Sequence, residues 1–334
     1  MPASIREVAR MAGVSTATVS RVVTGAAFVE KGTQEKVLEA IRVLNYVPNL
    51  LAKGLKSRSG GFIGLVLTEI SHEYFSAVIS YIEDAVSARG YTLILANAKG
   101  QDRTGETEVL HKLLGREVDG IILMTPSLAP EMLQALRRGA RPVVAFDCYH
   151  DAADTHRVLL DEYRAGRLAA DHLADLGHRD LYCITGPRQG HISGERLRGF
   201  REGLVARGIE LGEERVFPGD FEYQSGLEAA RRILRGRQRV TAVWAQNDVM
   251  ALAAMAELQR AGRSIPGDHS VLGMDDVPLA DFSHPRLSTI RQPLKDMCRK
   301  AVHLLIKLRE GGRASRKVFF EPTLLVREST ERRE

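Results

Sequence analysis

The stretch that decides the fold of the N-terminal region reads Ala12-Gly13-Val14-Ser15-Thr16-Ala17-Thr18-Val19-Ser20-Arg21. Gly13 stands where a tight turn between two helices needs a residue that tolerates a positive φ angle. Ser15 is a natural N-cap for a helix that begins at the next residue, and this start turns Val19 inward. The pattern predicts a helix-turn-helix unit, in which the first residues of the second helix enter the major groove of DNA.

Two more helices are expected around this stretch. Ser4-Ile5-Arg6-Glu7 has the spacing of a capping box, in which the serine and the glutamate satisfy free backbone N–H groups at a helix start. Apolar residues then recur at helical intervals up to Ala12. A third helix fits residues 33–45, with Val37 turned inward. Three short helices of this kind make a small all-α head.

The excess positive charge of the chain is confined to its first 60 residues. They hold nine Lys/Arg and four Asp/Glu, a net charge of +5, whereas the remaining 274 residues hold 38 of each. Apolar and charged fractions of 44% and 27% describe a globular protein. The sequence contains neither a membrane-length apolar run nor a secretory signal, so we expect a cytoplasmic protein. A basic segment on a neutral body predicts a head that binds nucleic acid.

From Phe62 onward the pattern changes to apolar strands that alternate with amphipathic helices. A first series of apolar runs occupies residues 62–67, 91–95, 120–124 and 142–146, and a second occupies 157–160, 181–184, 242–245 and 270–273. Repeated β-α-β units predict parallel sheets, and two series predict two α/β lobes with doubly wound sheets. We place the head at residues 1–47, a hinge at 48–60, one lobe at 61–160 plus 291–322, and the other lobe at 161–290 plus 323–330.

Several motifs together resemble the lac repressor (LacI/GalR) family of transcription regulators. They include the stretch quoted above, Leu44-Asn45-Tyr46-Val47-Pro48, and Ala52-Lys53-Gly54-Leu55-Lys56, and the resemblance continues through the whole chain. It implies a repressor with a hinge helix that enters DNA beside the head. It also implies a core like that of periplasmic binding proteins, with an effector site between the lobes.

The resemblance assigns DNA contacts to individual residues. Thr16, Ala17 and Arg21 stand where bases are read, and Leu55 stands where a leucine from each subunit enters the minor groove. Arg21 can donate two hydrogen bonds to a guanine, and an apolar wedge kinks the duplex. Lys56 matches a hinge lysine of members that prefer a central C·G step. The full set of candidate DNA contacts is Ser4, Ser15, Thr16, Ala17, Thr18, Ser20, Arg21, Lys53, Leu55 and Lys56.

Polar and aromatic residues follow the core strands, where parallel sheets bind ligands. These residues match effector positions of the resembled family, and Arg196 and Asp275 are the strongest candidates. Asp161, Asp248 and Asp276 fit a helix-capping role equally well. The candidate effector residues are Ser71, Tyr74, Phe75, Asp147, Arg196, Phe221, Asn247, Asp275 and Gln292.

Departures from the family bear on the identity of the effector. Gly190 and Ile192 stand where purine-sensing members carry polar side chains, and Cys148 replaces their stacking tryptophan, so we do not expect a purine. Thr185-Gly186-Pro187 and Gly219-Asp220-Phe221-Glu222 resemble the ribose-regulator branch. We therefore expect a pentose or another small sugar.

Another departure follows the apolar run at residues 157–160. This chain has Asp161-Glu162 where members carry Asp-Asn. Glu162 therefore need not make the polar contact that the asparagine makes in those members.

Other functions fit the sequence less well. A transport-type sugar-binding protein would share the core fold, but it predicts a signal peptide and no basic head. An enzyme predicts a Gly-rich phosphate loop, a nucleophile elbow or metal-spaced histidines, and the sequence has none of these. Cys148, Cys183 and Cys298 lack disulfide or zinc spacing, so we expect core cysteines and neither metal nor cofactor. Control of the same regulator by a protein partner or by a non-sugar ligand stays open.

The expected assembly is a symmetric homodimer. The segment after Val326 is polar and has no heptads, so it predicts no tetramer-forming coiled coil. Two-fold symmetry would place two heads on a palindromic operator whose half-sites lie roughly 10 bp apart. The expected partners are therefore operator DNA, a small-molecule effector and a second copy of the chain, with no membrane.

Overall fold

The computed structural model describes residues 3–24, 28–46, 60–68, 70, 72–98, 113, 118–125, 141–149 and 155–333. Apart from Gly60, the predicted hinge, with its candidate contacts Lys53, Leu55 and Lys56, lies outside these residues, as does Ser71. The chain divides into two compact units, Met1–Gly60 and Gly61–Glu334. Within the described ranges, no helix is long and apolar enough to cross a membrane.

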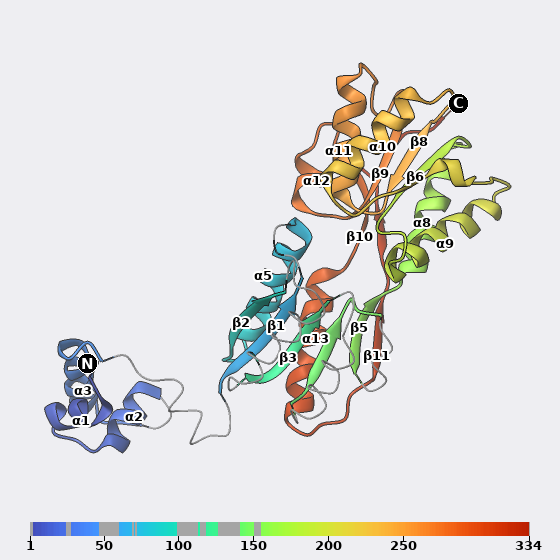
Figure 1. The fold of residues 1–334 in the computed structure, drawn as a ribbon. Helices are drawn as coiled ribbons and strands as arrows, with labels where there is room; N and C mark the ends of the chain where they lie inside the picture. Colours follow the sequence, from blue (N-terminus) through green and yellow to red (C-terminus); the bar gives the residue numbers. More distant parts are fainter. Residues whose placement is uncertain are drawn as a thin grey trace. The chain divides into compact units, whose positions relative to one another are not determined.

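The described part of the first unit is a head of helices (Figure 1): α1 (Ile5–Ala12), α2 (Thr16–Thr24) and α3 (Lys31–Val43). Their small apolar core is centred on Val8, Val19 and Val37, which are fully buried. The three helices predicted from the sequence are thus present. The third helix begins and ends two residues before its predicted bounds, and it ends early because the chain turns at Asn45, whose φ angle is +45°.

The predicted caps of the head are confirmed. The Glu7 N–H donates to Ser4 Oγ at 3.4 Å, and the Ser4 N–H donates to Glu7 Oε2 at 2.6 Å, which completes the capping box at the start of α1. Gly13 ends α1 with a φ angle of +67°, as a turn of this kind requires. The Thr18 N–H donates to Ser15 Oγ at 3.1 Å, so Ser15 caps α2.

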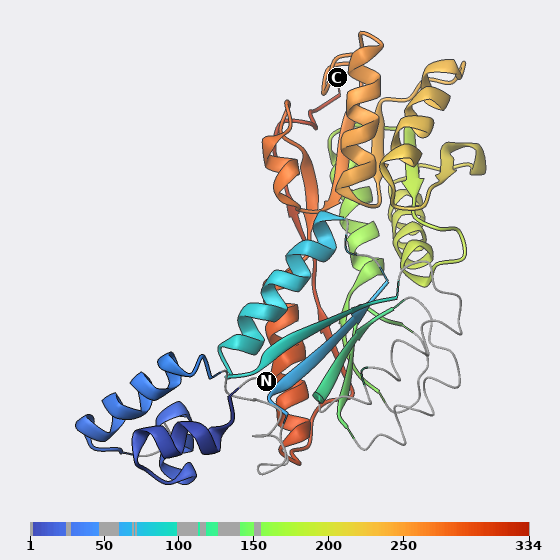
Figure 2. The same cartoon turned by 60° about the vertical axis from the view of Figure 1, so that its left-hand side comes forward.

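The first sheet of the core, sheet A, is parallel throughout and has the order β11-β5-β4-β3-β1-β2. Its strands are β1 (Phe62–Leu67), β2 (Thr92–Asn97), β3 (Val118–Met124), β4 (Val143–Phe146), β5 (His156–Leu160) and β11 (Lys317–Phe320). Helices α5 (Glu73–Ser87) and α13 (Leu294–Arg309) lie side by side on one face (Figures 1 and 2). Leu65 packs in the core cluster on their side and Val66 in a separate cluster, so β1 is buried on both faces, as its apolar run predicts.

The second sheet, sheet B, has the order β12-β10-β9-β8-β6-β7. Its strands are β6 (Leu181–Thr185), β7 (Val216–Pro218), β8 (Ala242–Ala245), β9 (Ser270–Asp275), β10 (Ser288–Arg291) and β12 (Thr323–Leu325). The edge strand β12 runs antiparallel to β10, and the other pairs are parallel. Short elements η1 (Glu213–Arg215) and α12 (Pro278–Phe282) complete this lobe.

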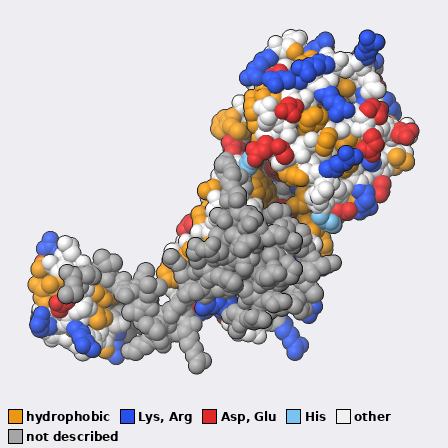
Figure 3. Space-filling view, viewed as in Figure 1, with side chains coloured by type: hydrophobic (Ala, Val, Ile, Leu, Met, Phe, Trp, Pro, Cys, Tyr) orange, Lys and Arg blue, Asp and Glu red, His pale blue; other side chains and the backbone are white. Residues whose placement is uncertain are grey.

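Helices cover both faces of sheet B. Helices α8 (Glu162–Asp175) and α9 (His191–Val205) share a core cluster with Trp244 of β8. Helices α10 (Tyr223–Arg235) and α11 (Asp248–Arg260) share another cluster with its neighbour Val243. Lys/Arg and Asp/Glu side chains are interspersed over the surface of this lobe (Figure 3), in keeping with the near-zero net charge of the body.

The predicted fold class is confirmed: an all-α helix-turn-helix head precedes an α/β core with two doubly wound, mainly parallel sheets. The hinge helix of that prediction lies outside the described residues. Cys148, Cys183 and Cys298 are buried and form no disulfide among the described residues, as expected of core cysteines. The chain crosses between the sheets after β5, after β10 and after β11, and these crossings bring the carboxyl ends of strands from both sheets together.

Candidate functional site

Helix α2 presents most of the candidate DNA contacts on one exposed face. Ser15, Thr16, Ala17, Ser20 and Arg21 are exposed, whereas the intervening Val19 is fully buried. Thr18 is half-buried and its hydroxyl lies 3.0 Å from that of Ser15. Ser4 is exposed at the start of α1, where its hydroxyl also serves the capping box. This face can therefore approach DNA without disturbing the core of the head.

A group of polar side chains gathers at the carboxyl ends of the strands of both sheets, and we call it the inter-lobe cluster. Its members come from five helix or strand ends of the core and from within α9. They are Tyr74, Asp147, Glu162, Arg196, Asp275 and Gln292. Five of these six are candidate effector residues from the sequence, and Glu162 is the addition.

Hydrogen bonds link the members of the cluster in pairs. Arg196 Nε donates to Glu162 Oε2 at 2.6 Å, and Arg196 Nη1 donates to the carbonyl oxygen of Gln246 at 2.7 Å. Tyr74 Oη donates to Asp147 Oδ2 at 3.0 Å, and Gln292 Nε2 donates to Asp275 Oδ1 at 2.7 Å. The Arg196 and Glu162 side chains are only 4% and 1% exposed. Water therefore does little to screen the charges of this ion pair.

Burial shifts the protonation of the cluster. Burial raises the pKa of Glu162 to about 8 and that of Asp275 to about 7, although the Arg196 guanidinium opposes both shifts. Burial also raises the pKa of Asp147. The pKa of Tyr74 is raised by its burial and by the nearby carboxylates. The cluster thus holds more acids than its one guanidinium balances, which is typical of a functional site.

Several buried polar atoms at the cluster have no hydrogen-bond partner within the described part of the chain. They are Asp147 Oδ1, Glu162 Oε1, Gln292 Oε1 and the neighbouring Ser193 Oγ. A buried polar atom without a partner costs on the order of 1–3 kcal/mol. Three of these atoms are acceptors, so a molecule with several N–H or O–H donors would satisfy them.

The backbone is strained at the same strand ends. Asp147, Phe221, Asp275 and Asp276 have φ angles of +51°, +72°, +114° and +60°. Such conformations cost about 1–3 kcal/mol each in residues other than glycine, and they concentrate where side chains must be aimed at a ligand. At Phe221, Gly186 leaves the space for the ring, because a Cβ there would lie 2.1 Å from it.

The remaining candidate effector residues differ in their contacts. Asn247 Oδ1 accepts the Met250 N–H at 2.9 Å, and its Nδ2 donates to the carbonyl oxygen of Phe221 at 2.8 Å. Asn247 is therefore a cap for α11 that also holds the Phe221 backbone. Phe75 is half-buried and meets Tyr74 edge-on, with ring centroids 5.4 Å apart. Ser71 lies outside the described residues.

Of the three aspartates that fit a capping role, only Asp161 has it. Asp161 caps α8 by accepting the Arg164 N–H at 2.8 Å. Asp248 is the first residue of α11 and accepts from the Val277 N–H and the Thr289 hydroxyl. Asp276 forms ion pairs with Arg291 and Arg327, both at 2.6 Å. The capping interpretation is therefore wrong for Asp248, which ties α11 to β10 and to Val277, and for Asp276, which ties the end of β9 to Arg291 and Arg327.

Comparison with known proteins decides the family. Residues 4–49 match the family described as "Bacterial regulatory proteins, lacI family", and residues 170–330 match the "Periplasmic binding protein-like domain". The HTH-type transcriptional repressor PurR of Photobacterium profundum is 34% identical over 331 residues, which are 98% of this chain and 99% of PurR. The chain belongs to the lacI family. It is a DNA-binding repressor with an effector-binding core.

Solved structures of lacI-family proteins share the whole fold. The transcriptional regulator CelR in complex with cellobiose is 32% identical, with a TM-score of 0.74 over 98% of this chain and 99% of CelR. The lac repressor dimer bound to operator and the anti-inducer ONPF is 27% identical, with a TM-score of 0.87 over 99% of this chain and 100% of that one. The resemblance inferred from the N-terminal motifs is thus confirmed at the level of the family.

Sequence reasoning missed three polar residues of this lacI-family core. Glu162 stands out in the sequence as a departure from the family and not as a site residue. Gln246 is fully buried, and its side chain accepts the Gly186 N–H at 3.0 Å and donates to the carbonyl oxygen of Ser193 at 3.1 Å. A glutamate directly after a buried strand and a capping aspartate is the available signal for Glu162. No local pattern distinguishes Gln246 or Ser193.

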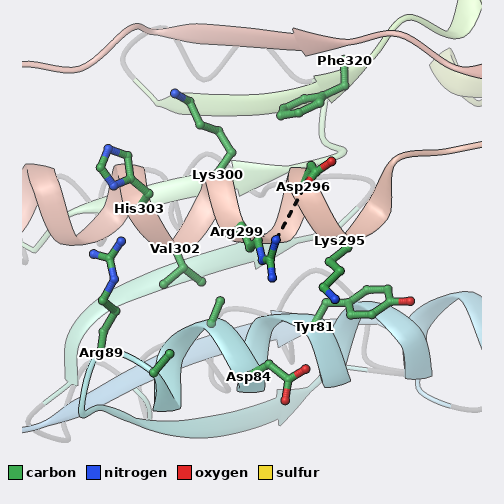
Figure 4. A pocket seen from close by; sticks show the side chains of 12 residues that line it. Tyr81, Asp84, Arg89, Lys295, Asp296, Arg299, Lys300, Val302, His303 and Phe320 are labelled. Atoms are coloured by element: carbon green, nitrogen blue, oxygen red, sulfur yellow. Dashed lines mark ion pairs between the residues drawn. The ribbon is translucent and has the colours of Figure 1, made fainter.

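A hollow lies away from the inter-lobe cluster, at the seam between α5 and α13. It has a volume of about 560 Å³, and Lys295, Arg299, Lys300 and Arg89 are among the residues that line it (Figure 4). Arg299 pairs with Asp296 at 3.9 Å, and these side chains are 62% and 68% exposed. Charged groups as exposed as these are hydrated. They do not need a ligand to compensate them, in contrast to the buried polar atoms of the inter-lobe cluster.

Proposed function

We propose that this repressor binds a palindromic operator as a homodimer and that a sugar held between the lobes sets its affinity for that operator. In this proposal the head (residues 1–47) reads the operator and the hinge (48–60) connects it to the core. The lobe of residues 61–160 plus 291–322 meets the lobe of residues 161–290 plus 323–330 around the sugar.

The observation that carries the sugar proposal is the set of unpaired buried acceptors. Asp147 Oδ1, Glu162 Oε1 and Gln292 Oε1 each lack a partner among the described residues. A sugar presents several hydroxyl donors in different directions, whereas a flat base presents its donors in one plane. Aromatic side chains at the same place, Tyr74 and Phe221, suit the apolar face of a sugar ring.

A purine-related effector is the second candidate, and the name of the relatives favours it. PurR repressors match this chain over nearly its whole length at 34% identity. The contacts of Cys148 favour a sugar instead. Its side chain is 3% exposed and donates to the carbonyl oxygen of Thr125, so it offers no face on which a base could stack. The solved CelR structure, a cellobiose complex, also supports a sugar.

The proposed switch connects the lobes to the DNA through the hinge. A sugar that favours one arrangement of the lobes would change the separation of the two hinges in the dimer, and with it the fit of the heads to both half-sites. A difference in sugar affinity of about 1–3 kcal/mol between the two states is enough to change operator occupancy. The solved lac repressor, a dimer on its operator, supports the dimeric form of the proposal.

The test is fluorescence anisotropy of the full-length protein on a palindrome with a central C·G step, taken from the DNA upstream of its own coding sequence. The titration is repeated with pentoses, hexoses, cellobiose, purine bases and nucleosides. We expect at least one sugar to change the operator Kd by tenfold or more. A change produced by a purine and by no sugar would replace the first candidate with the second.

A further inference from the structure

The inter-lobe cluster contains an imbalance of charge that a neutral sugar would not correct. Asp147, Glu162 and Asp275 contribute three carboxyl groups, and Arg196 contributes the one guanidinium that faces them among the described residues. Glu162 contributes the third carboxyl group and is the one that pairs directly with Arg196, at 2.6 Å. We infer that the effector is a polyhydroxylated amine, such as an amino sugar, whose ammonium group lies against Glu162 and Asp147.

The surroundings of Glu162 supply no other positive charge that the structure describes. Arg196 faces it from α9, Asp147 from the end of β4, and Asp275 from the end of β9. The nearby phenols of Tyr74 and Tyr149 stay neutral, because burial raises the pKa of both. Buried carboxylates are costly unless an opposite charge pairs with them. A cation in the ligand would supply the missing partner.

The unpaired atoms have the chemistry that an ammonium group requires. Glu162 uses Oε2 for Arg196, and Asp147 uses Oδ2 for Tyr74, so each carboxyl group keeps one buried oxygen without a partner in the described part of the chain. An ammonium group has three N–H donors and no acceptor, and its bonds to carboxylates are about twice as strong as neutral ones. Gln292 Oε1 remains for a hydroxyl of the same ligand.

Protonation of the cluster without a ligand agrees with this assignment. Burial raises the pKa of Glu162 to about 8, while Arg196 is the cationic neighbour that the structure describes for it. A proton then neutralises the side chain in place of the cation. A bound ammonium group would displace that proton, so Glu162 would be protonated when the site is empty and ionised when it is filled.

The inference rests on the proposed function, and its test separates the two. Isothermal titration calorimetry of the full-length protein would compare D-glucosamine, D-galactosamine and D-mannosamine with their parent hexoses and their N-acetyl derivatives. The N-acetyl group removes the positive charge and keeps the nitrogen. We expect at least one amino sugar to bind tenfold or more tightly than its parent and its N-acetyl derivative.

Glu162→Gln tests the residue, because the amide keeps an oxygen for Arg196 and removes the charge. In this variant the preference for the amine should fall to twofold or less. Glu210→Gln removes an exposed glutamate of the same lobe and should keep the full preference. Unchanged circular dichroism would show that both variants are folded.

Each other outcome has a definite meaning. A parent hexose that binds as tightly as its amine would overturn the inference and leave the sugar proposal standing, as would a preference that survives in Glu162→Gln. Failure of every sugar to bind would overturn both. The comparison of each amino sugar with its parent and its N-acetyl derivative on the wild-type protein tests the inference by itself. A poorly folded variant would therefore not leave the inference untested.

Discussion

The head and the inter-lobe cluster handle polar groups in opposite ways. In the head, α2 keeps Thr16, Ala17 and Arg21 exposed, above a small core in which Val19 is fully buried. In the cluster, Arg196 and Glu162 are nearly inaccessible. The head can thus keep its contacts ready for DNA at little cost, whereas the cluster holds charges and strained backbone that gain their full compensation only from a ligand.

The two regions also differ in how they are encoded. The turn and reading helix of the head come from one uninterrupted stretch, residues 12–21. The cluster draws its side chains from positions between Tyr74 and Gln292, which only the fold brings together. The comparison therefore predicts that a change in one region leaves the function of the other intact.

The largest effect is expected where the cluster depends on close helix packing. Gly199 lies where α9 crosses α8, and a Cβ on it would lie 2.0 Å from the carbonyl oxygen of Tyr163. Gly199→Ala must push the helices apart and move Arg196, which lies one turn earlier in α9. We expect a loss of about 3 kcal/mol in the free energy of unfolding of the core, measured by urea denaturation.

The control for this substitution lies in the same helix. Gly194 has no atom within 4 Å of an added Cβ, so Gly194→Ala should leave the core at least as stable as the wild type. Equal losses from both alanines would mean that the helix crossing is not the cause.

The next effect concerns the core of the head. Val37 is fully buried in α3. Val37→Ala should lower the free energy of unfolding of the head by about 2 kcal/mol, because the few side chains of this small core cannot fill the cavity that the substitution leaves. Operator affinity should fall while the binding of the effector stays within twofold. Val43→Ala in the same helix is the control. Val43 is 54% exposed, so this substitution should hardly change the stability of the head or its operator affinity.

The cluster should also make the stability of the core depend on pH. Below pH 7 the folded protein keeps protons on Asp275 and Glu162 that the unfolded chain has already released, because their pKa values are raised to about 7 and about 8. The free energy of unfolding should therefore fall by on the order of 2 kcal/mol as the pH rises from 6 to 8 without ligand. Urea denaturation across this range measures the fall, and Glu162→Gln should reduce it to the part that Asp275 contributes. A rise over the same range would contradict the raised pKa values.

The smallest effect is expected at the capping box of the head. Ser4→Ala removes the hydroxyl that accepts the Glu7 N–H, and it should destabilise the head by about 1 kcal/mol. Thermal unfolding followed by hydrogen exchange of α1 amides measures the change. Exchange in α8 and α9 of the core should not change, and faster exchange there would break the proposed independence of the two regions.

The sequence predicts most of the fold because the signals are local. Continuous apolar runs identify the strands from β1 to β6 and also β8 and β9, and the capping box and Gly13 identify the turns of the head. The strands β7, β11 and β12 escape prediction because they are only three or four residues long and none is fully buried. Short strands that are only partly buried carry too few apolar positions to show a period, whereas the four-residue strands β4 and β8 are continuous apolar runs.

The site is less predictable than the fold. Arg196 and Asp275 are recognisable because they match positions of the family, but the hydrogen bonds that organise them are not. Glu162 is the main example, because its effect depends on Arg196, a residue 34 positions away in the sequence that meets it at 2.6 Å. A single sequence holds no signal for such a pair.

The most direct test of the division between head and inter-lobe cluster replaces one arginine in each region. Operator affinity by fluorescence anisotropy and effector affinity by calorimetry would be measured for Arg21→Ala and Arg196→Met in the full-length protein. We predict that Arg21→Ala weakens operator binding by roughly 10- to 100-fold and leaves effector binding within twofold. Arg196→Met should abolish effector binding and leave the operator Kd of the ligand-free protein within twofold. If either variant impaired both affinities equally, the division between a reading head and a controlling cluster would be wrong.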